Sequence, residues 1–399
     1  MVSLEVNYEI RGKTMIQMIT AYTEEVDEVE DGIAEILGQL DFAALKKNSV
    51  GLVTCHFDFT NSGFIGELRK KLPFDIIGMS TMASANQYGR SMYSLSLAVL
   101  TSDDVVFETA MTGPLSDGDY EEKIKTVYSD AAQKLPGRPS LILAFFPYIK
   151  DISGASMHKS FDGICEGVPF WGSIATNVDV SFDSCTTFHN GDTGKDGLSM
   201  ILMFGPVDPE FVVVSMPAQN IGKNRGLITR SEGCMIKEIN GIPPLQFLES
   251  LGVVVMKDAP NVSPLMVYYR GSTEPVALAI YSIGDDGSLM CGGEMTEGAS
   301  VAIGEITTEG ILASTRESMD RVLQTNKRNG AMFLPCVSRY LMLTPNQNDE
   351  LDLIAGKLEN GKIMPFVAGY SGGEICPVRD EEGILRNRFH NFTFSAYII

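Results

Sequence analysis

The sequence predicts an α/β protein with mixed β-sheets flanked by helices, built from repeated β-α-β-β units in two halves. The main observation is a short unit that occurs three times, at 72–81, 168–176 and 364–373. In each copy an apolar strand closes on Pro-Phe and turns through glycine into hydroxyl residues. Such strand ends can present backbone N–H groups and hydroxyls to a small ligand.

The surroundings of the three copies match as well. Apolar residues at helical spacing precede each copy, as at Phe64, Leu68 and Leu72 before the first and at Leu351, Ile354 and Leu358 before the third. An apolar strand opens each unit and another closes it. The opening and closing strands are, in order, 51–55 with 93–100, 140–146 with 198–204, and 330–335 with 392–399.

The remaining segments complete the two halves. Strands at 95–100 and 105–109 are expected to form a hairpin across Thr101–Asp104. The polar stretch 217–225 suggests a boundary, which gives halves of 1–220 and 221–399. In the second half, Asn240-Gly241 predicts a turn, and a helix that carries Leu312 and Val322 is expected to end near Gly330.

Composition limits the function. The 399 residues carry a net charge of −20, which argues against nucleic acid and anionic membranes as partners because phosphate binding needs a positive field. Seven cysteines without a Cys-x-x-Cys pair fit a reducing cytoplasm better than a disulfide or zinc framework. No signal core or membrane-length apolar run is visible. A cytoplasmic protein is the expectation.

The hydroxyl residues of the repeated loops are the first candidate ligand contacts. They are Ser80, Thr81, Ser173 and Ser371. Each could donate a hydrogen bond to a ligand, or could instead cap the helix or turn that follows it.

Charged groups near the third loop suggest a ligand class. Glu374 follows Gly372-Gly373, and Arg339 lies just beyond another strand end. A carboxylate and a guanidinium that face one cleft would suit a zwitterion such as an amino acid. The alternative is that the two side chains pair with each other and brace the loop.

Two chemical alternatives also have sequence support. Gly369-x-Ser371-x-Gly373 matches a nucleophile elbow, and Asp380 and His390 follow in the hydrolase order. However, the elbow needs a helix directly after the serine, and Pro377 with a charged loop follows instead. Haem is the second alternative, because the chain has four histidines and a Cys376-Pro377 dipeptide. A structural role is favoured for each histidine, so no cofactor is expected.

Several of these segments resemble one family. Cys336-Val337-Ser338-Arg339, the stretch 365–377 and His390–Phe394 look like the C-terminal half of a FIST sensory domain, and 229–252 is similar to where that half begins. Residues 73–81 with the strand 94–100 resemble the N-terminal half. The chain departs from the family pattern at Ala83-Ser84, where Gly-Glu is usual, and at Phe392, where a polar residue is usual.

The resemblance implies an intracellular sensory module for signal transduction that binds a small, amino-acid-like ligand without catalysis. It spans about residues 15–399, so a separate signalling output protein is expected to read the signal. Some members of the family resemble haem-based nitric-oxide sensors. The expected ligand-binding residues are Ser80, Thr81, Ser173, Arg339, Ser371, Gly373 and Glu374.

Overall fold

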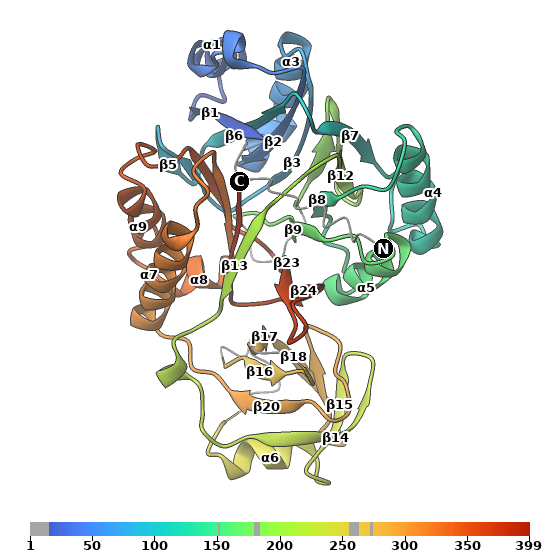
Figure 1. Cartoon of the computed structure of the whole chain (residues 1–399). Coiled ribbons are helices and arrows are strands. Elements are labelled where there is room, and N and C mark those ends of the chain that lie inside the picture. Colours follow the sequence, from blue (N-terminus) through green and yellow to red (C-terminus); the bar gives the residue numbers. More distant parts are fainter. Residues whose placement is uncertain (1–15, 151, 179–183, 255–262, 272–273) are drawn as a thin grey trace, which may run out of the picture.

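The computed structural model describes residues 16–150, 152–178, 184–254, 263–271 and 274–399. Within these ranges the chain has an α/β fold with mixed sheets, as the sequence predicts. Three six-stranded sheets form a main body, and a seven-stranded sheet forms a smaller domain at the bottom of Figure 1.

The three body sheets share the same central pairing. In each, two strands run parallel, and a third strand lies antiparallel beside the first of them. In that order the strands are β2 (Asn48–Cys55), β3 (Asp75–Ser80) and β6 (Leu95–Ser102); β8 (Leu141–Phe146), β9 (Phe170–Ile174) and β12 (Ser199–Phe204); and β21 (Ala331–Pro335), β22 (Phe366–Gly369) and β25 (Phe394–Ile398). β3, β9 and β22 are the strands that contain or directly follow the Pro-Phe pairs.

Helices connect the two parallel strands of every pair. The first connection contains α2 (Phe57–Asn61) and α3 (Phe64–Lys71), the second α5 (Gly154–Ile164), and the third α8 (Val337–Met342) and α9 (Asp349–Lys357). The apolar spacing in the sequence marks α3, α5 and α9 because these helices bury one face against a sheet.

Each hairpin that follows a parallel pair leaves its own sheet. β4 (Ser84–Asn86) and β5 (Arg90–Ser91) extend the third sheet at β22, β10 (Thr187–His189) and β11 (Asp192–Gly194) extend the first at β3, and β23 (Glu374–Arg379) and β24 (Leu385–His390) extend the second at β9. The three sheets are therefore interlocked through their second parallel strands.

Each sheet also has one strand paired on the outer side of its antiparallel strand. β7 (Val106–Met111) pairs with β12, β13 (Glu210–Val214) with β25, and β1 (Gln17–Thr23) with β6. The predicted hairpin of 95–100 with 105–109 is therefore wrong. Both edges of β6 are already occupied by β1 and β2, so β7 continues into the second sheet instead.

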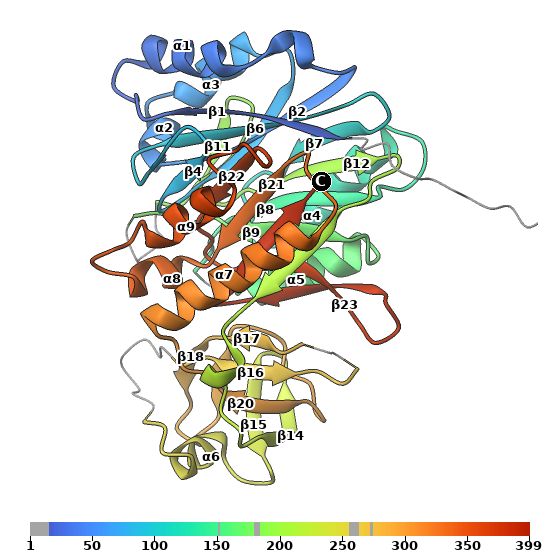
Figure 2. The same ribbon diagram turned by 60° about the vertical axis from the view of Figure 1, so that its left-hand side comes forward.

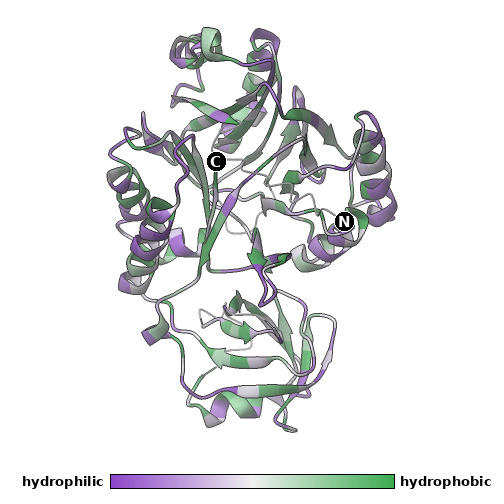
Figure 3. Ribbon diagram, viewed as in Figure 1, coloured by the Kyte–Doolittle hydropathy of each residue, from purple (hydrophilic) through white to green (hydrophobic). Residues whose placement is uncertain are grey.

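Side chains alternate between two cores along the parallel strands. In β2, Leu52 points into a central core that all three sheets share, whereas Val53 points toward α3 and α1 (Val29–Gln39). The second sheet is covered by α4 (Tyr120–Gln133) and α5, and the third by α7 (Thr308–Gln324) and α9 (Figure 2). In Figure 3 the strands at the centre are mostly hydrophobic, and hydrophilic residues lie on the outer helices.

The smaller domain is built between β13 and α7. It contains β14 (Gly226–Glu232), β15 (Met235–Ile239), α6 (Pro244–Ser250), β16 (Leu265–Tyr268), β17 (Val276–Leu278), β18 (Ile280–Ile283), β19 (Leu289–Cys291) and β20 (Ser300–Ile303). Asn240 and Gly241 both have positive φ, as the predicted turn requires. The predicted division at 220/221 lies at a short 3-10 turn, Ala218–Asn220, ahead of β14. α7 ends at Gln324 rather than near Gly330.

No helix in the described ranges combines the length and apolar character that a membrane crossing requires.

Candidate functional site

The three repeated loops meet in the middle of the body. The Thr81 hydroxyl donates to the Tyr370 carbonyl at 2.8 Å, and the Ser80 hydroxyl donates to the Thr176 carbonyl at 2.8 Å. The Gly372 N–H donates to the Ile174 carbonyl at 2.9 Å. We call this meeting place, formed by residues 80–83, 174–176 and 370–373, the loop junction. It exists because the carboxyl ends of the three parallel pairs lie at one place in the fold.

The predicted hydroxyl contacts lie in or beside the loop junction and are fully buried. Ser173 donates to the Ser371 oxygen at 2.8 Å, and Ser371 also accepts the Gly373 N–H at 3.0 Å. The capping alternative holds only locally, for the turn at Ser371. None of the hydroxyl residues is the N-cap of a described helix. In this structure the hydroxyls join the loops to one another.

Arg339 points away from the loop junction. Its guanidinium contacts Glu350 at 2.7 Å, and it also donates to Thr315 and to the carbonyls of Ile311 and Ser215. Arg339 and Glu350 are 1% and 0% exposed. The alternative that Arg339 pairs with Glu374 is wrong. Arg339 instead braces α7, α8 and α9 against the end of β13.

Glu374 has a different environment. It is fully buried at the start of β23, where its Oε2 accepts the Thr393 N–H at 3.1 Å and the Thr393 hydroxyl at 2.7 Å. Its Oε1 has no hydrogen-bond partner among the described residues. Burial raises the pKa of the Glu374 carboxyl to about 8, against the lowering effect of the Thr393 hydrogen bonds and of the nearby Cys336 thiol and Ser371 hydroxyl. The same carboxyl adds to the effect of burial in raising the pKa of the nearby Cys336 thiol.

The turn between β24 and β25 connects Glu374 to the smaller domain. Asn391 donates its N–H to the Ala277 carbonyl at 2.8 Å, and its side chain accepts the Ala279 N–H at 3.1 Å. Phe392 adopts a left-handed conformation with φ of 58°, which is uncommon for a bulky residue. This backbone geometry lets Asn391 face the smaller domain while Thr393 faces Glu374.

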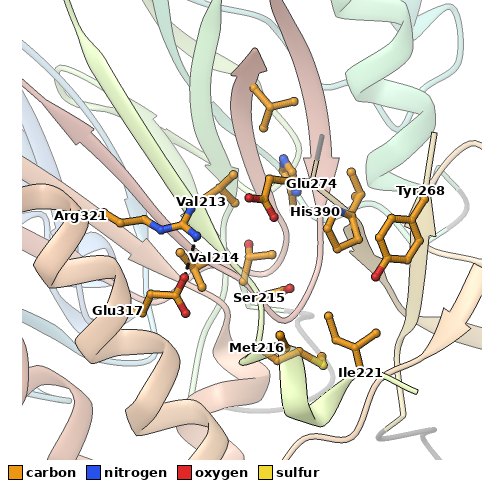
Figure 4. Close-up of a pocket in the computed structure, with 15 residues that line it drawn as sticks. Val213, Val214, Ser215, Met216, Ile221, Tyr268, Glu274, Glu317, Arg321 and His390 are labelled. Carbon is orange, nitrogen blue, oxygen red and sulfur yellow. Dashed lines mark hydrogen bonds and ion pairs between the residues drawn. The ribbon is translucent and has the colours of Figure 1, made fainter. Parts of the chain in front are cut away.

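A cavity of about 370 Å³ lies beside this turn, between the body and the smaller domain (Figure 4). We call it the interdomain cavity. Thr393 and His390 line it from the side of Glu374, and Tyr268 lines it from the smaller domain. Its volume is in the range of small-molecule sites.

The charges of the interdomain cavity are mixed. Arg321 of α7 contacts Glu317 at 2.6 Å, and Glu274 of the smaller domain also lines the cavity. A second cavity, of about 290 Å³, shares Val213, Glu274, Arg321 and Val378 with the first. Arg321 and Glu274 therefore line both cavities.

The serine hydrolase alternative lacks its geometry. β23 follows Ser371 where the elbow needs a helix. Asp380 lies in the exposed turn of the β23–β24 hairpin and pairs with Arg386 at 2.9 Å. His390 places its Nε2 3.2 Å from the Cys376 carbonyl oxygen. The three residues that the order in the sequence suggested are not brought together as a triad.

His56 and His189 have separate environments, whereas His158 and His390 lie close enough for the charge of His390 to affect the pKa of His158. His56 contacts Asp58, and His189 contacts the Thr109 hydroxyl at 2.9 Å. His158 packs against Phe170, and burial lowers the pKa of His390 to about 4. In the described part of the chain no three metal-binding side chains cluster.

Sequence reasoning missed several residues of this region. Arg321 and Glu274 carry no motif, because one is an ordinary exposed position of an amphipathic helix and the other precedes a short strand. Asn391 and Thr393 do have a signal, since they lie in the segment His390–Phe394 that resembles the family. Their role as a connection depends on the smaller domain, which the sequence does not position.

Comparison with protein families identifies the chain. Residues 49–242 match the FIST N domain, and residues 243–377 match the FIST C domain. Together the two matches cover most of the chain, so the protein belongs to the FIST family. FIST domains are sensory domains in signal transduction. No curated protein matches the chain.

Proposed function

We propose that the protein is an intracellular sensor that binds an amino-acid-like metabolite in the interdomain cavity and passes the signal to a separate output protein. The observation that carries the proposal is a cavity with a guanidinium and two carboxylates on its wall, directly beside the half-paired Glu374. Glu374 has a strongly raised pKa and one carboxylate oxygen without a hydrogen-bond partner among the described residues. Groups with perturbed pKa values cluster at functional sites.

The charges suit a zwitterion. Arg321 can hold a carboxylate through two parallel hydrogen bonds, and Glu274 can accept an ammonium group. Arg321 is 42% exposed and pairs only with Glu317 of its own helix among the interactions described, so an incoming carboxylate can compete for it. Arg339 is unsuited to this role because its donors are engaged by buried partners.

The position of Thr393 supports a path for the signal. Thr393 lines the interdomain cavity and donates twice to Glu374, while Asn391, two residues earlier, is bonded to the smaller domain. A ligand that contacts Thr393 would change both the pairing of Glu374 and the position of the smaller domain. In this proposal Gly373 and Glu374 respond to the ligand, and the hydroxyls of Ser80, Thr81, Ser173 and Ser371 carry the change through the loop junction.

The cellular setting is part of the proposal. None of the seven cysteines takes part in a disulfide, and six of them are buried. Cysteines outside disulfides are typical of a reducing compartment.

The experiment is a thermal-shift screen of the full chain against amino acids and related metabolites. Binding to the native state raises the free energy of unfolding by mass action, by about 2.7 kcal/mol at a ligand concentration of 100 Kd. Tm rises as a result. We expect at least one amino acid to raise Tm. We also expect Arg321→Gln to lower the affinity for that amino acid at least tenfold. No shift across a broad panel would overturn the proposed function.

The matched control is Arg316→Gln. Arg316 is an exposed arginine of the same helix and lines none of the cavities described above. If Arg321→Gln and Arg316→Gln bind the ligand equally well, the interdomain cavity is not the site, although sensing itself would stand.

A further inference from the structure

A second cleft lies beside α5, along the β23–β24 hairpin. It consists of two neighbouring cavities of about 660 and 250 Å³, which share Arg270 and Arg388 as lining residues. Arg388 belongs to β24 of the body, and Arg270 follows β16 of the smaller domain. We call this space the α5 cleft. It contains neither Arg321 nor Glu274.

The two shared arginines lack carboxylate partners. Neither side chain makes a hydrogen bond or an ion pair with any described residue. Arg270 is exposed to solvent, whereas the Nε of Arg388 is shielded from it. The Arg388 guanidinium is held 5.2 Å from the centre of the Tyr269 ring. This is unusual in a chain of net charge −20, where acidic groups outnumber basic ones. A shielded cation without a partner costs free energy unless a ligand supplies the counter-charge.

His158 adds a second shielded group without a partner to the same cleft. It lines the smaller cavity from α5, and its Nε2 is shielded and has no partner among the described residues. Burial lowers the pKa of His158 to about 3, with His390 and Arg388 adding to the effect. The ring is therefore neutral near pH 7 and can donate one hydrogen bond.

Among the described residues, no nearby acid forms an ion pair with either arginine, and several acids are bonded elsewhere. Asp162 accepts a hydrogen bond from the Asn387 amide at 2.6 Å, and Glu294 pairs with Lys159 at 2.6 Å. Asp380 pairs with Arg386. The remaining carboxylates at the rim of the cleft, among them Glu381 and Glu382, are exposed to solvent.

We propose that the α5 cleft binds the phosphate group of a small phosphorylated metabolite. Two guanidiniums match the charge of a phosphate monoester, which is close to −2 at pH 7, and their planar N–H groups suit its oxygens. The neutral His158 donates a further hydrogen bond. Because Arg388 and His158 belong to the body and Arg270 to the smaller domain, the bound phosphate holds the two parts together.

The test uses the full chain and measures Tm against inorganic phosphate, with acetate and chloride at matched ionic strength. We expect phosphate to raise Tm in a saturable way. Arg270→Gln and Arg388→Gln should each lower the apparent affinity for phosphate at least tenfold. Arg388→Lys keeps the charge without the planar fork and should bind with intermediate strength. Arg316→Gln, on α7, should bind phosphate as the unmodified chain does.

Each other outcome contradicts the proposal. Equal shifts with chloride would show a general salt effect, and a larger saturable shift with acetate would make the ligand a carboxylate. A phosphate shift that survives in Arg270→Gln, whose exposed side chain is not needed for folding, would place the phosphate elsewhere. Arg321→Gln should leave the phosphate shift unchanged, which separates this site from the interdomain cavity.

Discussion

Two buried acidic groups in this protein have opposite environments. Glu350, in the first turn of α9, faces α7 with a guanidinium, a threonine hydroxyl and the Tyr370 hydroxyl around it. Glu374 lies beside the loop junction with one oxygen bonded to Thr393 and the other unpaired in the described structure. The first group is saturated and holds three helices in place. The second keeps bonding capacity beside a cavity, which is what a responsive group needs.

The largest effect should come from breaking the saturated pair. Arg339→Met leaves the Glu350 carboxylate buried without its cation, and we expect the free energy of unfolding to fall by about 3–5 kcal/mol. Denaturant unfolding measures this free energy. The exposed Arg316→Met on α7 should change it by less than about 0.5 kcal/mol. A loss of the same small size in Arg339→Met would show that the pair does not brace the helices.

The second test addresses the protonation of Glu374. Its pKa is raised to about 8 in the folded state, so between its unfolded pKa and pH 8 the folded protein binds more protons than the unfolded chain. Stability must therefore fall as pH rises through that window, by up to about 1.4 kcal/mol per pH unit. Glu374→Gln removes the titrating group. We expect the difference between the variant and the unmodified chain to grow in favour of the variant from pH 5 to pH 8.

Unfolding curves recorded at several pH values check this prediction. The informative quantity is the difference between the two proteins, because other groups titrate in both. A difference that stays constant from pH 5 to pH 8 would mean that Glu374 has an ordinary pKa. Its environment would then not favour the protonated carboxyl.

The smallest effect is expected at Ser371. Ser371→Ala removes the acceptor of the Gly373 N–H and of the Ser173 hydroxyl, which can still donate to the Ile174 carbonyl at 2.7 Å. We expect a loss of about 1 kcal/mol in stability. Model esters distinguish the roles: turnover that disappears in Ser371→Ala would restore the hydrolase function, whereas a variant with unchanged ester background supports a purely structural hydroxyl.

Local features of the fold could be predicted well from the sequence. Apolar spacing at Leu351, Ile354 and Leu358 indicates α9, and Asn240-Gly241 indicates a turn, because both depend on short-range geometry. The partner of a strand is a different matter. The strands at 95–102 and 106–111 look like a hairpin but belong to different sheets, since β1 and β2 already occupy both edges of β6.

The candidate site was predictable in the same uneven way. The sequence marks Glu374 and Arg339 as unusual charged residues at strand ends, but it does not show that Arg339 turns toward Glu350, eleven residues later, across two helices. Nor does the sequence show that Arg321 and Glu274 line the same cavity. Those groups come together only when the smaller domain packs beside β24 and α7.

The sequence by itself determined the α/β class, the three Pro-Phe loops and the family, because periodicity and local motifs are written in neighbouring residues. Only the tertiary structure decided that the three loops meet, that Arg339 and Glu374 lie in separate environments, and that two clefts lie between the body and the smaller domain. The physical reason is that strand pairing and the burial of charge depend on residues far apart in the chain. Which carboxylate is saturated and which stays half-paired is settled by those distant contacts.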